Sequence, residues 1–391
     1  MDFYFTEEEE RFRQELRDFF AKEIAPERQL SGGEGGAYSE EQLEFFRWLR
    51  GKLGERGWLG LGLPREYGGL EASTMERYIF SWEWGYHGSF FPLTGARIVA
   101  PTLAMHGTEW QKQEFLPKII SGEVDFCLGY TEPEAGSDLA SLQIRAVADG
   151  DDYVINGQKL FTSGAHRTEW CWLAARTDPD VPRHQGISLF LADMTSPGIT
   201  VRPLWTMAES RTNEVFWDNV RVPKRYLVGE LNQGWTYMTT ALTIERIVLY
   251  EVSHNVRALE ELIKFAKETR RNGQPLSKDP VIQNMLAELS AEVTALTLLS
   301  HRNAWMVSRG IVPHYEAAMV KTLGSEQLQR IMYAAMKIMG LYGTVQGSKW
   351  APLAGYFERQ RRAMYIGPVG GGTNEVERNI IAIRGLGLPR R

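Results

Sequence analysis

The sequence predicts an α+β fold in three parts: an N-terminal helical domain (1–125), a middle β-barrel-like domain (126–233) and a C-terminal four-helix bundle (234–391). Two observations lead to this prediction. Apolar residues recur at helical spacing in the first and last thirds, whereas short alternating runs bounded by Gly and Pro fill the middle. There is no strand–helix alternation and no GxGxxG motif, which argues against a Rossmann domain.

Capping boxes mark helix starts in the N-terminal part. Thr6 is followed three residues later by Glu9, and Thr108 is followed in the same way by Gln111, so each hydroxyl can cap the helix that begins there. A further helix is predicted over 40–54.

The middle part is predicted to open with a hairpin. Asn156-Gly157 lies between two alternating runs in DDYVINGQKLFTS, and this dipeptide is typical of a two-residue hairpin turn. The segments GISLFLADM, GITVRPL and EVFWDNVRVP follow as strands.

Four helices are predicted in the C-terminal part. The first runs from about 235 to Asn272 and is ended by Gly273. Asp279 and Pro280 begin the second as N-cap and first residue. The helices are predicted over 235–272, 280–309, 314–340 and 373–384. Short connections between them favour a bundle.

Composition excludes several classes of function. The chain has 391 residues, 43% of them hydrophobic, and a net charge of −5, so we expect no nucleic-acid partner and no integral membrane contact. Its two cysteines, Cys127 and Cys171, argue against a disulfide framework and favour a reducing compartment, which predicts a cytoplasmic protein. The seven histidines are scattered without HExxH or CxxC motifs, so we expect no metal site.

Two segments of the middle part contain candidate binding residues. In LGYTEPEAGSD (128–138), N–H groups near Gly136 and Ser137 can form an anion nest, and Thr131 adds a hydroxyl; a domain-joining turn explains the same residues. In KLFTSG, Phe161 can stack on a planar ring and Ser163 can donate a hydrogen bond to it; a cross-strand aromatic pair is the alternative.

The helix that begins near residue 235 carries a candidate general base. Met238, Leu242 and Leu249 share a helix face with Glu245. Loss of hydration on such an apolar stripe can raise the pKa of a carboxyl group by up to about 3–5 units, which suits a base working near neutral pH. The alternative is a structural ion pair of Glu245 with Arg246 or another cation.

A glycine-rich loop, VGGGTNEVER, lies near the C-terminal end. Gly370, Gly371 and Gly372 allow close approach to the backbone, and Thr373 can cap the following helix. The segment contains no acid or base before Glu375. A flexible tail loop is the alternative.

Taken together, these segments resemble the acyl-CoA dehydrogenase family over nearly the whole chain. YTEPEAGSD resembles the family's flavin loop, INGQKLFTSG its flavin-stacking strand, DNVRVPKRYLVGELNQGW the end of its β-domain, and GGTNEVERNIIAIRGLGLPR its C-terminal segment. The resemblance implies FAD, usually in a tetramer. It also implies α,β-dehydrogenation of an acyl-CoA thioester, as in fatty acid β-oxidation, with an electron-transfer flavoprotein as acceptor.

The resemblance also assigns residues to the ligands. Thr131 and Ser163 would approach the edge of the flavin ring, Phe161 would lie against it, and Gly136 and Ser137 would hold pyrophosphate or touch substrate. The implied cofactor residues are Leu128, Tyr130, Thr131, Gly136, Ser137, Phe161, Thr162, Ser163, Arg270, Arg271, Lys337, Gly340, Thr373 and Glu375. The implied substrate residues are Ser137, Thr243, Arg246 and Gly370.

The catalytic residues follow from a departure within the family. Many relatives carry the catalytic Glu directly before the Gly-Thr of the tail loop, but here that region holds Gly371. A smaller branch, with isovaleryl- and long-chain-type enzymes, places the Glu before an Arg on the first bundle helix, as IER does at 244–246. Glu245 is therefore the predicted base, and the N–H of Gly371 is the predicted donor to the thioester carbonyl.

Other departures concern contacts between subunits. TRRNG (269–273) replaces the more usual Arg-x-x-Phe-Gly, leaving open whether Arg270 or Arg271 meets the phosphates, and Lys337 stands where many relatives have Gln. Such changes resemble branches that form mixed tetramers from two different subunits. Homotetramer and mixed heterotetramer therefore both stay open, as do a partly inactive structural subunit and an oxygen-using acyl-CoA oxidase of the same fold.

Overall fold

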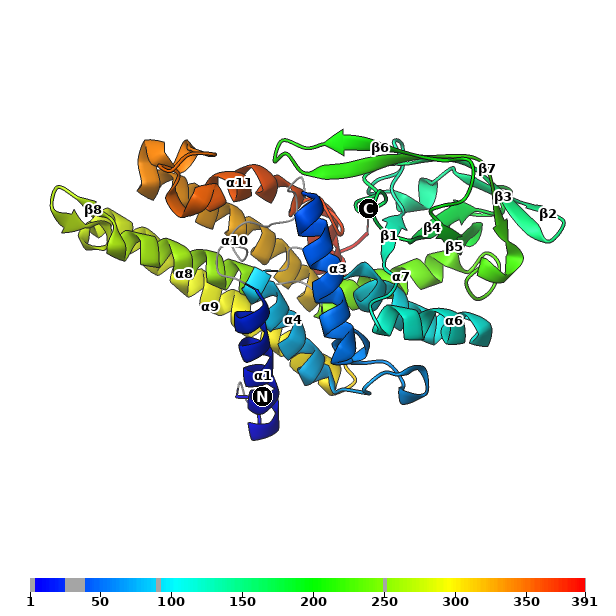
Figure 1. Ribbon diagram of the computed structural model, residues 1–391, viewed down its shortest axis with the longest axis horizontal. Coiled ribbons are helices and arrows are strands. Elements are labelled where there is room, and N and C mark those ends of the chain that lie inside the picture. The colour runs from blue at the N-terminus through cyan, green and yellow to red at the C-terminus, as the bar shows by residue number, and fades with distance from the viewer. Residues whose placement is uncertain (1–3, 25–38, 89–92, 249–251, 391) are drawn as a thin grey trace. The chain divides into compact units, whose positions relative to one another are not determined.

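The computed structural model describes residues 4–24, 39–88, 93–248 and 252–390, with the backbone alone at 243–248 (Figure 1). The chain divides into two compact units. The first comprises 1–34, 73–90 and 246–391, and the second comprises 35–72 and 91–245. The predicted order of helical, β and helical parts is confirmed.

The second unit is built around a curled mixed sheet. Among the described residues its seven strands are β1 (Phe126–Gly129), β2 (Arg145–Asp149), β3 (Asp152–Lys159), β4 (Trp170–Arg176), β5 (Ile187–Asp193), β6 (Ile199–Trp205) and β7 (Arg211–Pro223). They run in the order β1-β4-β2-β3-β7-β6, and β5 pairs with β4. β1 and β4 are parallel, with Phe126 opposite Trp170.

Helices of the same unit share one apolar core with this sheet. They are α5 (Ala100–His106), α6 (Glu109–Ile120) and α7 (Gly234–Val248), whereas α3 (Glu40–Glu55), also in this unit, has none of its residues in that core. Phe115 of α6 and Met238 of α7 are buried together with Trp172 of β4 and Phe190 of β5. The predicted box at Thr108 is confirmed, because its hydroxyl accepts the N–H of Gln111 and the Gln111 side chain accepts the N–H of Thr108.

The first unit is helical. Its helices are α1 (Glu7–Glu23), α4 (Thr74–Gly88), α8 (Val252–Glu268), α9 (Pro280–Ser308), α10 (Tyr315–Met339), α11 (Tyr356–Ala363) and α12 (Asn374–Ile380). α8, α9 and α10 pack against one another (Figure 1). The predicted caps at Thr6 and Asp279 are confirmed by their hydrogen bonds to Glu9 and Val281.

One turn prediction is wrong. Asn156 and Gly157 lie inside the continuous strand β3. The hairpin turn lies earlier in the chain, between β2 and β3, where Asp149 pairs with Asp152. Gly157 is required for another reason: it has φ +146°, and a Cβ there would approach Ile144 to 2.8 Å. The register against β7 shifts at this point, which marks a bulge.

The predicted long helix to Asn272 ends at Glu268 instead. A small hairpin follows, formed by β8 (Arg270–Arg271) and β9 (Gln274–Pro275). Asn272 and Gly273 form its turn with φ +52° and +82°. Two successive residues with positive φ suit Asn-Gly, so this dipeptide makes the turn that was predicted at Asn156-Gly157.

Candidate functional site

Two segments predicted to contact the flavin lie side by side in the second unit. The N–H of Leu160 donates to the carbonyl oxygen of Thr131 at 2.8 Å. The Nζ atom of Lys159 donates to the carbonyl oxygen of Tyr130, also at 2.8 Å. These bonds join the chain beyond β1 to the chain at the end of β3, so the predicted residues 130–131 and 159–163 come together.

A closed turn shapes the next part of the 128–138 segment. Glu132 and Ala135 exchange backbone hydrogen bonds of 3.1 Å in both directions. Gly136 and Ser137 follow it, both exposed, and neither makes a hydrogen bond within the described part of the chain. A Cβ at Gly136 would meet nothing within 4 Å. Free N–H groups in an open turn are what the predicted anion nest requires.

Phe161 is exposed and has an unusual backbone conformation. Its side chain is 56% exposed, and its φ of +56° lies in the left-handed region. That conformation costs roughly 1–2 kcal/mol in a residue other than Gly, so surrounding contacts must hold it. An exposed ring beside the exposed Ser163 fits the planar ring system of FAD. The alternative of a cross-strand aromatic pair finds no ring partner for Phe161 among the described residues.

Residues of β7 form hydrogen bonds with Thr162 and Ser163. Thr162 donates its N–H to the Asn213 carbonyl oxygen at 2.9 Å, and the Asn213 side-chain amide donates to the Thr162 carbonyl oxygen at 2.9 Å. The hydroxyls of Ser163 and Thr212 lie 3.0 Å apart. Asn213 Nδ2 also lies 3.2 Å from Nδ1 of His166. Sequence reasoning missed Asn213, because only the pairing of distant strands places it here.

A buried ion pair lies under the same two segments. Nζ of Lys159, whose side chain is fully buried, lies 2.9 Å from Oε1 of Glu132. The Glu132 carboxylate also accepts the N–H groups of Gln143 at 2.6 Å and Ile144 at 3.0 Å. Burial lowers the pKa of Lys159 to about 8, although the charge of Glu132 opposes the shift.

Sequence reasoning also missed this pair, although a signal was present. Tyr153, Ile155 and Lys159 occupy buried positions of β3. A lysine at a buried strand position needs a partner, since an unpaired buried charge is costly. The sequence does not identify Glu132 as that partner, because it lies 27 residues away.

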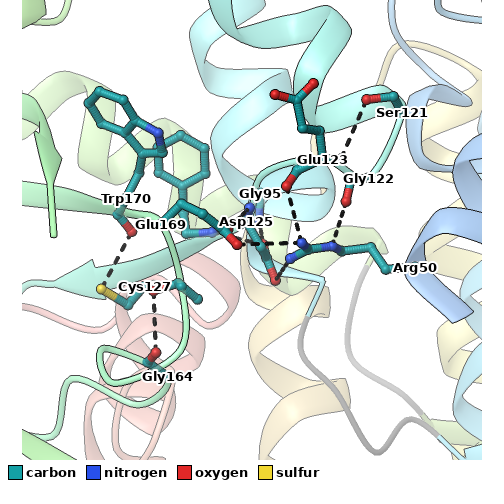
Figure 2. A network of polar contacts seen from close by, with 12 residues as sticks. Arg50, Gly95, Ser121, Gly122, Glu123, Asp125, Cys127, Gly164, Glu169 and Trp170 are labelled. Atoms are coloured by element: carbon teal, nitrogen blue, oxygen red, sulfur yellow. Dashed lines mark hydrogen bonds and ion pairs between the residues drawn. The ribbon is translucent and has the colours of Figure 1, made fainter. Parts of the chain in front are cut away.

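A polar network holds the start of β1 (Figure 2). Arg50 of α3 donates to the carbonyl oxygen of Gly122 at 2.7 Å and lies 3.8 Å from Asp125. Asp125 accepts the N–H of Gly95 at 2.7 Å, and its own N–H donates to Glu169 at 2.8 Å. Burial raises the pKa of Asp125, with Arg50 opposing the shift. The network fixes the starts of β1 and β4 to each other.

In the first unit, the glycine-rich tail loop has a defined conformation. Gly371 and Gly372 have φ of +65° and +99°, which favours glycine at both positions. The predicted cap at Thr373 is confirmed, since its side chain accepts the N–H of Val376 at 3.2 Å. The N–H of Gly371 donates no hydrogen bond within the described residues, and Gly370, Gly371 and Glu375 are exposed.

A second buried lysine holds this loop. Nζ of Lys321, on α10, donates to the carbonyl oxygen of Gly372 and, at 2.9 Å, to Oδ1 of Asn374. The amide of Asn374 in turn donates to Ser325 at 3.0 Å and to Glu326 at 3.2 Å. The glycines of the loop have no side chains that could hold it. The loop is instead held through the carbonyl oxygen of Gly372 and through the side chain of Asn374.

The two arginines predicted to contact the cofactor's phosphates, Arg270 and Arg271, make different contacts. Arg271 donates to the carbonyl oxygen of Ile338 at 3.3 Å, which places it beside the end of α10 near Lys337 and Gly340. Arg270 instead closes its own hairpin by donating to Gly273 at 3.1 Å.

For Glu245, the predicted base, the structure describes only the backbone. Thr243, Glu245 and Arg246 lie in α7, and their side chains lie outside the described part of the structure. Met238, on the same predicted stripe, is fully buried.

Comparison with known proteins identifies the family. Residues 6–123 match the family description "Acyl-CoA dehydrogenase, N-terminal domain", residues 127–220 match "Acyl-CoA dehydrogenase, middle domain", and residues 232–386 match "Acyl-CoA dehydrogenase, C-terminal domain". The chain belongs to the acyl-CoA dehydrogenase family. It is an oxidoreductase of this family that dehydrogenates acyl-CoA thioesters, and FAD is its cofactor.

Individual acyl-CoA dehydrogenases resemble the chain over its full length. Acyl-CoA dehydrogenase FadE26 of Mycobacterium tuberculosis is 38% identical over 99% of this chain and 98% of its own. The solved structure named Tcur3481-Tcur3483 steroid ACAD superposes with a TM-score of 0.92 at 37% identity, covering 100% of both chains. The ChsE4-ChsE5 complex from Mycobacterium tuberculosis gives a TM-score of 0.90 at 37% identity over 100% of both chains.

Two further findings concern other kinds of site. In the described part of this acyl-CoA dehydrogenase, no helix is long and apolar enough to cross a membrane. No cluster of three or more His, Cys, Asp or Glu side chains suited to a metal ion occurs among the described residues.

Proposed function

We propose that this acyl-CoA dehydrogenase acts on a bulky acyl-CoA of the steroid side-chain class, as one subunit of a mixed tetramer. Its similarity to a steroid acyl-CoA dehydrogenase over the full length of both chains carries this proposal. The relatives at similar identity include a complex of two differently named chains, which favours the mixed assembly. The absence of side chains at Gly370 and Gly371 is consistent with a large acyl group.

Glu245 is proposed as the base that removes the α-proton of the thioester. It precedes Arg246 on α7, in the arrangement of the branch that carries its base on this helix. FAD supplies the acceptor for the β-hydrogen, which leaves as a hydride. The free N–H of Gly371 is proposed to donate to the thioester carbonyl and to stabilise the negative charge that develops there.

The flavin is proposed to bind the second unit through three features of its surface. The exposed N–H groups at Gly136 and Ser137 receive the pyrophosphate, the exposed ring of Phe161 stacks on the flavin, and Ser163 meets its edge. Arg271, beside Lys337 and Gly340, is the better candidate than Arg270 for a further phosphate contact, because Arg270 is engaged within its own turn. An electron-transfer flavoprotein is the proposed acceptor, and cytoplasmic placement remains a prediction from composition.

Anaerobic titration with a panel of thioesters tests the substrate and the assembly together. The protein, expressed alone and together with a second acyl-CoA dehydrogenase chain, is mixed with straight-chain, branched and steroid side-chain acyl-CoAs while its visible spectrum is recorded. We expect the flavin band to bleach most rapidly with the steroid thioester. Equal bleaching by a short straight-chain thioester would contradict the substrate proposal. A colourless protein when expressed alone that becomes yellow only with its partner would support the mixed tetramer.

The same assay tests the base. Glu245→Gln is expected to keep bound FAD and to slow bleaching by about 10²–10⁴-fold, the usual contribution of a positioned general base. Glu230→Gln, which changes a carboxylate on the loop before α7, is the matched control and should bleach at the wild-type rate. A Glu245→Gln variant with wild-type kinetics would show that another group removes the proton. Oxygen uptake during aerobic turnover would instead favour the acyl-CoA oxidase alternative.

A further inference from the structure

We propose that the buried Lys159–Glu132 ion pair is a positioning device for the cofactor: it holds the flavin loop and the flavin-stacking strand in one fixed arrangement. The proposal rests on the flavin placement given above. Neither residue is assigned a contact with FAD. Their effect on the cofactor is exerted through the backbone of Tyr130 and Thr131 on one side and of Leu160 and Phe161 on the other.

The ion pair lies next to residues proposed to contact the flavin. Lys159 is two residues before Phe161, and Glu132 directly follows Thr131. Lys159 donates to both sides of Thr131, since its Nζ contacts the Tyr130 carbonyl oxygen at 2.8 Å and the Glu132 carboxylate at 2.9 Å. Together with the Leu160–Thr131 hydrogen bond of 2.8 Å, these contacts leave the base of the loop little freedom to move against the strand.

Glu132 connects the start of the loop to the residues that follow the loop. Its carboxylate accepts the N–H groups of Gln143 and Ile144 as well as the ammonium of Lys159. The loop is therefore fixed at its start by Lys159 and at its return by residues 143–144. Gly136 and Ser137 lie between these two fixed ends, and their unpaired N–H groups keep their orientation without contacts of their own.

The ion pair also helps to hold the strained backbone of Phe161. Phe161 keeps a left-handed backbone only if its neighbours restrain it, and Lys159 restrains the chain just before it while Asn213 restrains Thr162 just after it. Both Lys159 and Glu132 are at least nine-tenths buried, so water cannot replace these contacts at low cost. Loss of the pair should free the loop and the ring together.

Reconstitution of the apoprotein with FAD measures the effect. Wild type and Lys159→Met are stripped of flavin as full chains, with the partner subunit present if expression requires it, and titrated with FAD. We expect the apparent dissociation constant of FAD to rise by about 10-fold, as it does when only about a tenth of the molecules keep the competent arrangement. Glu132→Gln should raise it similarly, and the double variant should bind no more weakly than either single variant.

Hydrogen exchange supplies a readout that does not depend on FAD. In the apoprotein, the N–H groups of Ala135, Gln143 and Ile144 should exchange faster in both single variants than in wild type. Val220→Ala, which removes buried methyl groups from β7 in the same core, is the stability-matched control. It should lower the melting temperature while leaving the FAD dissociation constant and exchange in 130–144 unchanged.

The outcomes separate the possible failures. If Lys159→Met does not fold, Glu132→Gln, which keeps the side-chain shape, carries the same test. A folded variant with FAD affinity within 2-fold of wild type and unchanged exchange would overturn the positioning role. An equal loss of affinity in Val220→Ala would also overturn it, because the effect would then follow general stability. A wild-type protein that takes up no FAD even with its partner subunit present would overturn the flavin placement and the positioning role together.

Discussion

The segment of the second unit proposed to bind the flavin (130–138, the flavin loop) and the glycine-rich tail loop of the first are each held by a buried lysine, but in different ways. Lys159 binds a backbone carbonyl and a carboxylate that belongs to the loop itself, Glu132. Lys321 binds the carbonyl oxygen of Gly372 and the amide oxygen of Asn374. A loop with a long polar side chain can contribute to its own anchor. A loop made of glycines offers only its backbone, and the residue after it must help.

The difference also explains where each loop leaves free N–H groups. In the flavin loop, Gly136 and Ser137 lie beyond a closed four-residue turn and have ordinary negative φ or extended backbones. In the tail loop, Gly371 has a positive φ, so its N–H is presented by a conformation that favours glycine. The flavin loop therefore depends mainly on distant anchors, whereas the tail loop depends on residue type as well as on its anchor.

The largest expected effect comes from removing the tail-loop anchor. Lys321→Met leaves the Gly372 carbonyl and the Asn374 amide oxygen without this donor, and the free energy of unfolding should fall by about 1–3 kcal/mol. Urea unfolding measures the loss. Hydrogen exchange should accelerate over 366–380 and stay unchanged over 130–144, the reverse of the pattern expected for Lys159→Met.

An exposed lysine gives the control for this prediction. Lys264 lies on α8 of the same unit with an exposed side chain, and Lys264→Met should change the free energy of unfolding by less than about 0.5 kcal/mol. Faster exchange in both loops after Lys321→Met would contradict the view that each lysine holds only its own loop.

The next effect comes from adding a methyl group to the glycines. Gly371→Ala forces a Cβ into a left-handed conformation and should lower the free energy of unfolding by about 1–2 kcal/mol. Gly370→Ala is the matched substitution, because its Cβ would lie at an ordinary 3.4 Å from the Ile366 carbonyl oxygen and its φ is not positive. Gly136→Ala meets open space and should likewise be tolerated by the fold.

Thermal unfolding of the three variants measures these differences. If Gly371→Ala were as stable as Gly370→Ala, the tail loop would have to adopt another backbone, and its dependence on residue type would be refuted.

The sequence predicted well those features of the fold that depend on residues close together in the chain. The caps at Thr6, Thr108 and Thr373 formed as predicted, because each hydroxyl reaches an N–H three residues away. The predicted hairpin at Asn156-Gly157 failed because Gly157 is needed for close approach to Ile144, a contact with another segment. Local turn preference is the same at both Asn-Gly pairs, and only tertiary packing distinguishes them.

For the candidate site, too, the sequence predicts local motifs but not the contacts between distant segments. Thr131, Phe161 and Ser163 were predicted from motifs, and the structure places them on adjoining segments. Lys159, which anchors these segments, and Lys321, which anchors the tail loop, were not predicted, because their acceptors lie 27 and more residues away in the sequence. Residues expected to meet a ligand lie in recognisable motifs, whereas the residues that hold them in place come together only in the folded structure.

The smallest expected effect is a difference in pH response between the two regions. The segment after the flavin strand carries His166, whereas the tail segment 366–378 contains no histidine. Burial lowers the pKa of His166 to about 4, and the nearby charges of Arg211 and Arg167 act in the same direction, while its contact with Asn213 opposes them. The folded protein therefore keeps His166 neutral at pH values where the unfolded chain takes up a proton.

The sign of the effect follows from this difference in proton binding. Between pH 6.5 and 4 the unfolded state binds more protons at this residue, so stability is present above pH 6.5 and is lost as the pH falls. One proton limits the slope to about 1.4 kcal/mol per pH unit, and partial exposure of His166 makes it smaller. His166→Gln should flatten the dependence of the urea midpoint on pH in this window. An unchanged slope in His166→Gln would mean that folding does not lower the pKa of His166, and would remove the pH difference between the two regions.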